Sequence, residues 1–335
     1  MTDKEKKGGL SNNPIVKKIG GQRLVVIFVI VALFAFFCAK SPTFRQYSTI
    51  LNLLDTSYYV TYMAIGVTFA LITGGNDLSV GTGMVCYSLI GGYVVTKLGL
   101  PIGVGILLTV LCGVLMGILN GFLVAVMELP AFIATLCTMM IARGMGSICT
   151  KSQSINWPQA SSAQGWFRSL FKITVGETKY PLGFLWVIIL VIVMSIILTK
   201  TKPGRYIIAI GSNKEATRLS GVNVIKWHML AYIICGFFTG LAGLAYGATF
   251  QTVAPGTGAG LELDAICAAI IGGTSMTGGS GSIIGTLLGV FIMSLLKTGL
   301  PFIGLQANWQ QIITGIVLLV AVLIDVIRSK QAKRA

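Results

Sequence analysis

The chain has 335 residues, of which 54% are hydrophobic and only 10% are charged. Soluble domains carry about 25% charged residues, and disordered chains combine low hydrophobicity with high charge, so the composition excludes both classes. The net charge of +15 does not indicate a nucleic-acid partner, because the Lys and Arg residues stand in short segments between apolar runs. The composition instead predicts a polytopic membrane protein.

Ten apolar runs follow one another along the chain, most of them near the roughly 20 residues that a membrane-spanning helix needs. They lie at 24–39, 50–74, 80–96, 101–127, 130–149, 182–199, 228–250, 262–274, 281–299 and 308–326. The third and eighth runs are short and rich in glycine, which is typical of broken helices beside a transport path. We therefore expect an all-α polytopic membrane protein of about ten transmembrane helices, two of them short or broken, with residues 24–326 as the transmembrane domain.

The positive charges predict how the chain is oriented. Three segments hold 16 of the 25 Lys and Arg residues: 1–23, 200–226 and 327–335. Cytoplasmic segments carry an excess of Lys and Arg, and even numbers of predicted spans, six and then four, separate these three segments. We expect both termini to be cytoplasmic, 200–227 to be a long cytoplasmic loop and 150–181 to be a long outer loop.

Glycines repeat at every fourth position in two of the runs, so that each set lies on one helix face. The two sets are Gly113, Gly117 and Gly121, and Gly281, Gly285 and Gly289. Glycine at this spacing lets two helix backbones approach closely, so ordinary helix packing is the expected role.

A weak internal similarity relates the two short runs. An acidic segment at 76–79 precedes Ile-Gly-Gly at 90–92, and another at 262–265 precedes Ile-Gly-Gly at 271–273. The two acidic segments lie at opposite membrane faces in the ten-span arrangement, as an inverted repeat requires, although their spacings to the glycines differ.

Few ionisable residues stand within the runs. The notable ones are Asp55, Asp77, Arg143, Glu262 and Asp264. Charges at membrane depth are costly and face the bundle interior or a water path. Arg143 could pair with Asp264 or Glu262, and Asp77 could cap the short helix that follows it. A structural role and a path-lining role both stay open for these residues. No series of buried acids suggests a proton or sodium relay.

The enzyme motifs are weak or absent. The chain has no G-x-x-x-x-G-K-[ST] segment, so we expect no ATPase activity of its own. Gly278-Gly279-Ser280-Gly281 matches the G-x-S-G of rhomboid-type proteases, with His228 as the only histidine, but a turn between two spans explains these residues more simply. With one histidine and no cysteine pair at ligand spacing, no metal site is expected.

The predicted cytoplasmic loop contains signals for a short helix. Ser212 or Asn213 can cap it, Glu215 and Ala216 suit its first turn, and Gly221 suits its end. This pattern predicts about two helical turns on the cytoplasmic surface, which either face solvent or dock into a partner.

Several blocks together resemble a known family. They are Asn-Asp-Leu-Ser-Val-Gly at 76–81, Pro-Ala-Phe-Ile-Ala-Thr-Leu at 130–136, the loop at 204–223, Glu-Leu-Asp-Ala-Ile at 262–266, and Gly-Gly-Thr-Ser at 272–275 with Gly278-Gly279. In this order they are similar to the membrane permease subunits of bacterial ABC importers for simple sugars, of the ribose and galactose type. The similarity runs from about residue 40 to 328.

The resemblance implies a place and partners for the chain. It implies a multi-pass protein of the bacterial inner membrane, with a second permease subunit, identical or paralogous, completing the path for a monosaccharide. A cytoplasmic subunit would bind and hydrolyse ATP, so no cofactor is expected here. An extracytoplasmic sugar-binding protein would dock on outer segments, including 150–181 and 251–261.

The resemblance also implies two sets of functional residues. The ATPase-coupling set is Gly211, Asn213, Glu215, Ala216, Arg218 and Gly221. The translocation-path set is Asp77, Ser79, Phe132, Thr135, Asp264 and Thr274. Two alternatives stay open, a permease of the same family for another small solute and an ion-coupled secondary transporter.

Overall fold

The computed structural model describes residues 21–176 and 178–332, and over this part the chain is a bundle of α-helices. Ten helices correspond to the ten predicted runs. They are α2 (Gly21–Lys40), α3 (Tyr47–Ile72), α4 (Val80–Thr96), α5 (Ile102–Gly121), α6 (Ala131–Cys149), α8 (Leu182–Lys200), α11 (Val224–Phe250), α12 (Leu261–Ile271), α13 (Ile283–Gly299) and α14 (Ala307–Ala332). The all-α prediction is confirmed. Most of the predicted N-terminal tail, and residues 333–335 of the C-terminal tail, lie outside the described residues.

Seven of the described helices are long and apolar enough to cross a membrane, which supports a multi-pass membrane protein. The other three are α3, α4 and α12. Most residues of α3 are buried against other helices, which accounts for the Tyr, Ser and Thr residues among its apolar ones. α4 has 17 residues and α12 only 11, too few for a full span. The count of ten spans therefore stays a prediction.

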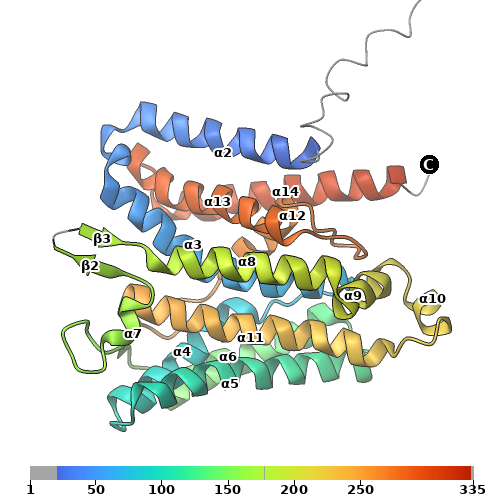
Figure 1. Cartoon of the computed structure of the whole chain (residues 1–335), viewed down its shortest axis with the longest axis horizontal. Helices are drawn as coiled ribbons and strands as arrows, with labels where there is room; N and C mark the ends of the chain where they lie inside the picture. The colour runs from blue at the N-terminus through green and yellow to red at the C-terminus, as the bar shows by residue number, and fades with distance from the viewer. Residues whose placement is uncertain (1–20, 177, 333–335) are drawn as a thin grey trace, which may run out of the picture.

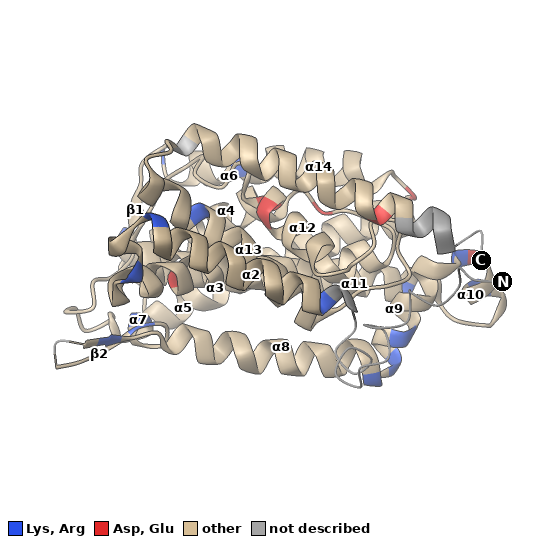
Figure 2. Cartoon of the chain, turned by 90° about the horizontal axis from the view of Figure 1, so that it is seen from above, with Lys and Arg blue, Asp and Glu red and all other residues tan. Residues whose placement is uncertain are grey.

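The long helices run side by side between two ends of the molecule (Figure 1). One end, here called the α10 end, carries α9 (Lys202–Ser212), α10 (Lys214–Leu219), the start of α2 and the end of α14. The opposite end, the hairpin end, carries α7 (Trp166–Ser169) and the β2–β3 hairpin. Lys and Arg residues gather at both ends (Figure 2). Of the three basic segments, the described parts at the start of α2, in α9 and α10 and at the end of α14 lie at the α10 end (Figure 1), and the cytoplasmic position of both termini stays a prediction.

Two segments expected to be loops contain regular secondary structure. The region 200–227 holds two helices, α9 and α10, and the first residues of α11, where the sequence predicted one short helix. α9 was missed because its apolar positions lie in a basic, proline-containing stretch. The region 150–181 holds β1 (Ile155–Asn156), α7, β2 (Ile173–Val175) and β3 (Thr178–Tyr180). The remaining elements are η1 (Pro42–Arg45), the π-helical η2 (Phe122–Val126), β4 (Thr252–Val253) and η3 (Leu300–Ile303).

α3 and α11 form the centre of the bundle. They pack against each other, and α11 also packs on α4 and α5 while α3 packs on α12 and α13. Fully buried aromatic and aliphatic side chains fill the space between them, among them Tyr58, Met63, Phe69 and Phe238. The other long helices surround this pair and expose many large apolar side chains, as lipid-facing or subunit-facing surfaces do.

The glycine stripes are packing surfaces, as predicted. Gly113 and Gly117 of α5 lie against Gly236 of α11, so that a Cβ on Gly236 would stand only 2.8 Å from the Cα of Gly117. Gly285 and Gly289 of α13 lie in the same way against the backbone of α12. In both pairs the absence of side chains lets two helix backbones touch.

The two short helices begin inside the bundle and meet there. Non-helical segments at 73–79 and 251–260 lead into α4 and α12. Gly81, in the first turn of α4, lies so close to α12 that a Cβ on it would stand 2.7 Å from the carbonyl oxygen of Gly258 and 2.7 Å from the backbone nitrogen of Glu262. The prediction of two short helices is confirmed. The inverted repeat stays a prediction.

The close contact between α5 and α11 leads to a stability prediction. Gly236→Ala should lower the free energy of unfolding by about 1–3 kcal/mol, because the added methyl group meets backbone that cannot move aside. Gly144→Ala on α6 is the matched control, since no heavy atom lies within 4 Å of its Cβ position. Thermal unfolding of the purified variants in detergent measures both. Equal midpoints for Gly236→Ala and the wild type would contradict the packing described here.

Candidate functional site

The short helix α10 has the local structure that the sequence predicts. The side chain of Asn213 caps it by accepting a hydrogen bond from the backbone nitrogen of Ala216 at 2.9 Å. Gly221, just past the helix, adopts a left-handed φ of 78°, which favours glycine. Ser212, the other predicted cap, is instead the last residue of α9.

α10 is a prominent, exposed element of the α10 end. Glu215 and Arg218 form an ion pair at 2.8 Å, with about two thirds of each side chain exposed (65% and 69%). Such exposed pairs contribute little to stability, so these side chains are free to serve another contact. Leu219, at the end of the helix, is 85% exposed, which gives this polar helix an apolar tip that the sequence analysis did not single out.

A second ion pair joins α10 to the turn before α6. Lys214 donates to Glu128 at 3.1 Å, and both side chains are exposed. Glu128 lies in the short turn between η2 and α6 and has a positive φ of 54°. The pair places α10 beside the start of the helix that carries Phe132 and Thr135.

The end of α9 touches two other segments at this end, the end of α3 and the turn between α12 and α13. We call this contact the glycine junction and define it by Ile72, Gly211, Gly278 and Gly279. Gly279 donates its backbone N–H to the carbonyl oxygen of Ile72 at 2.9 Å. A Cβ on Gly211 would stand 2.5 Å from the nitrogen of Gly279, and Gly278 has a positive φ of 86°. α9 therefore contacts the end of α3, which leads into the 73–79 segment, and the turn between α12 and α13.

A buried polar cluster holds the 73–79 segment in place. We call it the Asp77 network, and it comprises Asp77, Ser79, Asn120, Thr135 and Thr138. Asp77 Oδ1 accepts hydrogen bonds from the backbone nitrogen of Ser79 at 2.9 Å and from Ser79 Oγ at 2.6 Å. Asn120 donates to Ser79 Oγ at 3.0 Å and accepts from Thr138 at 2.7 Å. Thr135 Oγ1 accepts from the backbone nitrogen of Leu78 at 3.2 Å.

This network ties the 73–79 segment to α5 and α6, and all five of its side chains are buried. Asp77 was predicted to cap α4. Its carboxylate accepts instead from the backbone nitrogen of Ser79, the residue just ahead of the first residue of α4. Asn120 and Thr138 belong to the network but were not singled out from the sequence. A single Asn or Thr in an apolar helix gives no signal of its partners until the fold brings them together.

Three of the six predicted path residues, Asp77, Ser79 and Thr135, thus come together. Phe132 lies outside the network, on the exposed face of α6. Thr274 is buried beside Gly281, and its hydroxyl has no hydrogen-bond partner among the described residues. Asp264 lies in the first turn of α12, outside the Asp77 network.

The ion pairs inside the bundle differ from those expected. Asp264 pairs with Lys297 of α13, which corrects the proposed pairing with Arg143. Glu262 accepts from the backbone nitrogen of Gly260 at 3.1 Å, so it caps the start of α12. Lys297 was overlooked because it stands at the end of an apolar run, where basic residues usually reach the membrane surface.

The hairpin end has a deeply anchored segment. Trp157 is fully buried and donates to Ser88 Oγ of α4 at 3.2 Å. The neighbouring Ile155 pairs with Val253 in the β1–β4 ladder, which joins the 150–181 and 251–260 segments. Arg168 of α7 donates to the carbonyl oxygen of Gly247 at 3.4 Å, and burial lowers the pKa of its guanidinium.

His228 and Ser280, the two residues weighed for a protease, have different surroundings. His228 is buried beside Tyr232, and neither of its nitrogens has a hydrogen-bond partner in the described part of the chain. Ser280 lines a cavity that Gly211, Gly278 and Gly279 of the glycine junction also line. Among the described residues, no three His, Cys, Asp or Glu side chains are close enough to hold a metal ion.

Comparisons with known proteins agree with this architecture. Residues 49–322 match the family described as the permease component of the branched-chain amino acid transport system. The chain is 35% identical to the ribose import permease protein of Escherichia coli (strain K12), over 90% of this chain and 92% of the relative. It is 33% identical to the ribose import permease protein of Bacillus subtilis (strain 168), over 95% of each chain.

A third relative is the galactose/methyl galactoside import permease protein of Haemophilus influenzae (strain ATCC 51907 / DSM 11121 / KW20 / Rd), 31% identical over 92% of this chain and 95% of the relative. No solved structure matches the chain. The family match covers most of the sequence, and the resemblance found from the residues is confirmed. The chain belongs to the family of membrane permease components that includes these sugar import permeases.

Proposed function

We propose that the chain is the permease subunit of an ATP-driven bacterial importer and that it forms the path for a monosaccharide, ribose or a similar pentose or hexose. The observation that carries this proposal is the exposed, capped helix α10, joined through α9 and the glycine junction to the segments before α4 and α13. The sugar import permeases among its relatives supply the substrate class. Another small solute is the alternative, since the family description names branched-chain amino acids.

The α10 end is the cytoplasmic end in this proposal. α9 and α10 together carry Lys202, Arg205, Lys214 and Arg218, and the start of α2 adds Arg23. An excess of positive charge marks cytoplasmic segments. The exposed α10 would then meet the ATP-binding subunit, with Gly211, Asn213, Glu215, Ala216, Arg218 and Gly221 as the coupling set.

The glycine junction gives the coupling a physical route. Closure of the ATPase subunits on ATP would move α10, and with it α9, as a short lever. Because α9 touches Ile72 and Gly279 directly, this movement reaches the 73–79 segment and the turn before α13. Packed contacts of this kind have discrete arrangements, so a small shift at one end can select another arrangement of the helices.

The Asp77 network supplies the polar groups of the proposed path. Phe132 is 58% exposed on α6, on a surface that a second permease subunit would complete, and Thr135 lies one turn behind it. A reorganisation of the 73–79 segment would present carboxylate and hydroxyl oxygens to a sugar. Few such groups are present, which is consistent with a path that passes its substrate without binding it tightly.

The packing pattern favours an inverted repeat. α3 packs on α12 and α13, and α11 packs on α4 and α5, so the two central helices have matching neighbours. Each central helix is followed in the chain by a non-helical segment and then by one short helix, α4 after α3 and α12 after α11. On the hairpin end, the β1–β4 ladder joins the two segments on which the sugar-binding protein would dock.

The energy source distinguishes this proposal from an ion-coupled carrier. In cells of the native host, uptake of labelled ribose should fall to the level of a strain lacking the chain when ATP is depleted, and it should survive an uncoupler. The chain should also purify in mild detergent with a soluble ATPase, identified by mass spectrometry. Uptake that survives ATP depletion and stops with the uncoupler would establish the carrier instead.

Charge reversal tests the coupling helix. Glu215→Lys should weaken the contact with the ATPase subunit by about tenfold, for a loss of roughly 1–2 kcal/mol, and should reduce uptake accordingly. The unfolding midpoint should stay unchanged, because the Glu215–Arg218 pair is exposed. Lys200→Glu, an exposed charge reversal at the end of α8, is the control. If Glu215→Lys leaves uptake untouched, α10 is not the coupling helix.

A substitution at the glycine junction tests the route from α10 to the path. Gly211→Ala places a methyl group 2.5 Å from the nitrogen of Gly279, so α9 and the turn must separate. We expect ATP hydrolysis by the assembled complex to continue while uptake is largely lost. Gly103→Ala, with no heavy atom within 4 Å of its Cβ position, is the control. Uptake and hydrolysis lost together, with the complex no longer assembled, would indicate a structural role only.

A further inference from the structure

A cavity of about 1150 Å³ opens between α2, α12, α13 and α14. It exceeds the roughly 300–1,000 Å³ of ordinary small-molecule pockets. No member of the Asp77 network lines it, and Gly211 is the only predicted site residue that does. The cavity is therefore separate from the proposed sugar path.

The walls of the cavity are aliphatic along most of its length. On α2 the lining runs from Val25 to Leu33, a rise of about 12 Å along the helix. On α14 it runs from Ile316 to Asp325, a rise of about 14 Å. Half the hydrocarbon thickness of a bilayer is about 15 Å, so the cavity has the length of one acyl chain in one leaflet.

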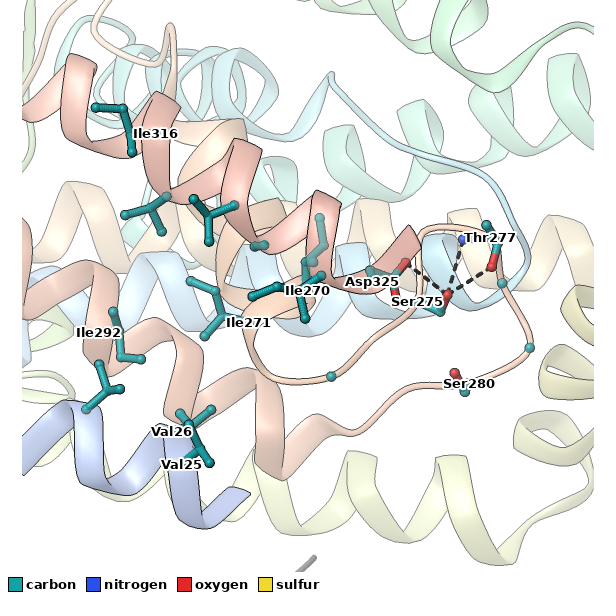
Figure 3. A pocket seen from close by; sticks show the side chains of 18 of the residues that line it. Val25, Val26, Ile270, Ile271, Ser275, Thr277, Ser280, Ile292, Ile316 and Asp325 are labelled. Carbon is teal, nitrogen blue, oxygen red and sulfur yellow. Dashed lines mark hydrogen bonds between the residues drawn. The ribbon is translucent and has the colours of Figure 1, made fainter. Parts of the chain in front are cut away.

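The polar groups of the cavity gather at one end. Figure 3 shows Ser275, Thr277, Ser280 and Asp325 together there, away from aliphatic side chains such as Ile292 and Ile316. This is the α10 end, because Ser280 belongs to the turn that forms the glycine junction. The cavity thus combines an apolar body at membrane depth with a polar head at the membrane surface.

The carboxylate of Asp325 lines this polar end, and Arg23 lies outside the lining, two residues before Val25 on α2. Asp325 Oδ2 accepts from Ser275 Oγ at 3.1 Å and from the backbone nitrogen of Met276 at 3.0 Å. None of the ion pairs among the described side chains includes Asp325. Arg23, at the start of α2, donates to Ser282 at 3.0 Å. A zwitterionic headgroup complements this arrangement, because its cationic group can pair with the Asp325 carboxylate. A purely anionic headgroup has no positive charge to offer Asp325.

We propose that this cavity binds an inner-leaflet phospholipid with an ethanolamine headgroup. An acyl chain lies along the aliphatic walls of α2 and α14. The ammonium group is bound by the Asp325 carboxylate, and the phosphate lies toward Arg23 and Ser280. The choice of the inner leaflet rests on the proposed cytoplasmic position of the α10 end, and the site does not depend on which solute the permease carries.

Titration of the purified full-length chain with a defined lipid tests this site. The delipidated protein in detergent is titrated with dioleoyl phosphatidylethanolamine or dioleoyl phosphatidylglycerol, and the bound lipid is counted by native mass spectrometry. The wild type should prefer phosphatidylethanolamine. Asp325→Asn should weaken that binding about tenfold, the effect of losing a hydrogen bond to a charged group, with little change for phosphatidylglycerol.

A cavity-filling variant provides an independent readout. Ala321→Phe, on the cavity side of α14, should abolish binding, and Leu319→Phe, on the exposed face of the same helix, should not change it. Equal affinity of the wild type for both lipids, or unchanged phosphatidylethanolamine binding in Asp325→Asn and Ala321→Phe, would overturn the proposal. If Ala321→Phe changes the oligomeric state and leaves lipid binding unchanged, the cavity is a contact between copies of the chain.

Discussion

The fold depends on how the chain provides hydrogen-bond partners for its backbone N–H and C=O groups where α4 and α12 begin inside the bundle. A membrane offers no water to unpaired N–H and C=O groups, and each one left without a partner costs several kcal/mol. The 73–79 segment solves this with side chains, since Asp77 accepts from the nitrogen of Ser79 and Thr135 accepts from that of Leu78. At the start of α12, Glu262 accepts from Gly260. The polar groups proposed for transport are therefore also the groups that make the breaks stable.

Glycine makes the second contribution, because it lets these breaks lie close to other backbone. Gly81 brings the first turn of α4 against α12, and Gly211 brings the end of α9 against Ile72 and Gly279. Contacts between backbones have little side-chain freedom to absorb a displacement. A movement of α9 must therefore displace the neighbouring segments, which is the property that a coupling element needs. The same packing that stabilises the bundle thus gives it a means of transmitting movement.

The sequence predicts the elements of this fold far better than the contacts between them. Hydropathy located ten helices, α4 and α12 among them, and cap chemistry located α10 with Asn213 and Gly221, because these signals are local. Such local signals could not identify Lys297 as the partner of Asp264, since the two residues are 33 positions apart and belong to different helices. Asn120 and Thr138 were missed for the same reason. The resemblance to sugar permeases named Asp77, Ser79 and Thr135 as path residues, a role that stays a prediction, but it could not show that the three are buried in one network.

One short turn, Gly278 to Ser280, faces two features of the α10 end at once. On one side its backbone bonds to Ile72 in the glycine junction, and on the other it lines the cavity of Asp325. Two binding events that bias the same element are coupled, and the coupling is reciprocal. If the turn shifts when α10 is engaged, the affinity of the cavity for its lipid must change, and an occupied cavity must resist or favour that shift by the same free energy. The lipid composition of the inner leaflet would then act on the transport cycle through this turn and the end of α9, which also lines the cavity, without any contact with the Asp77 network.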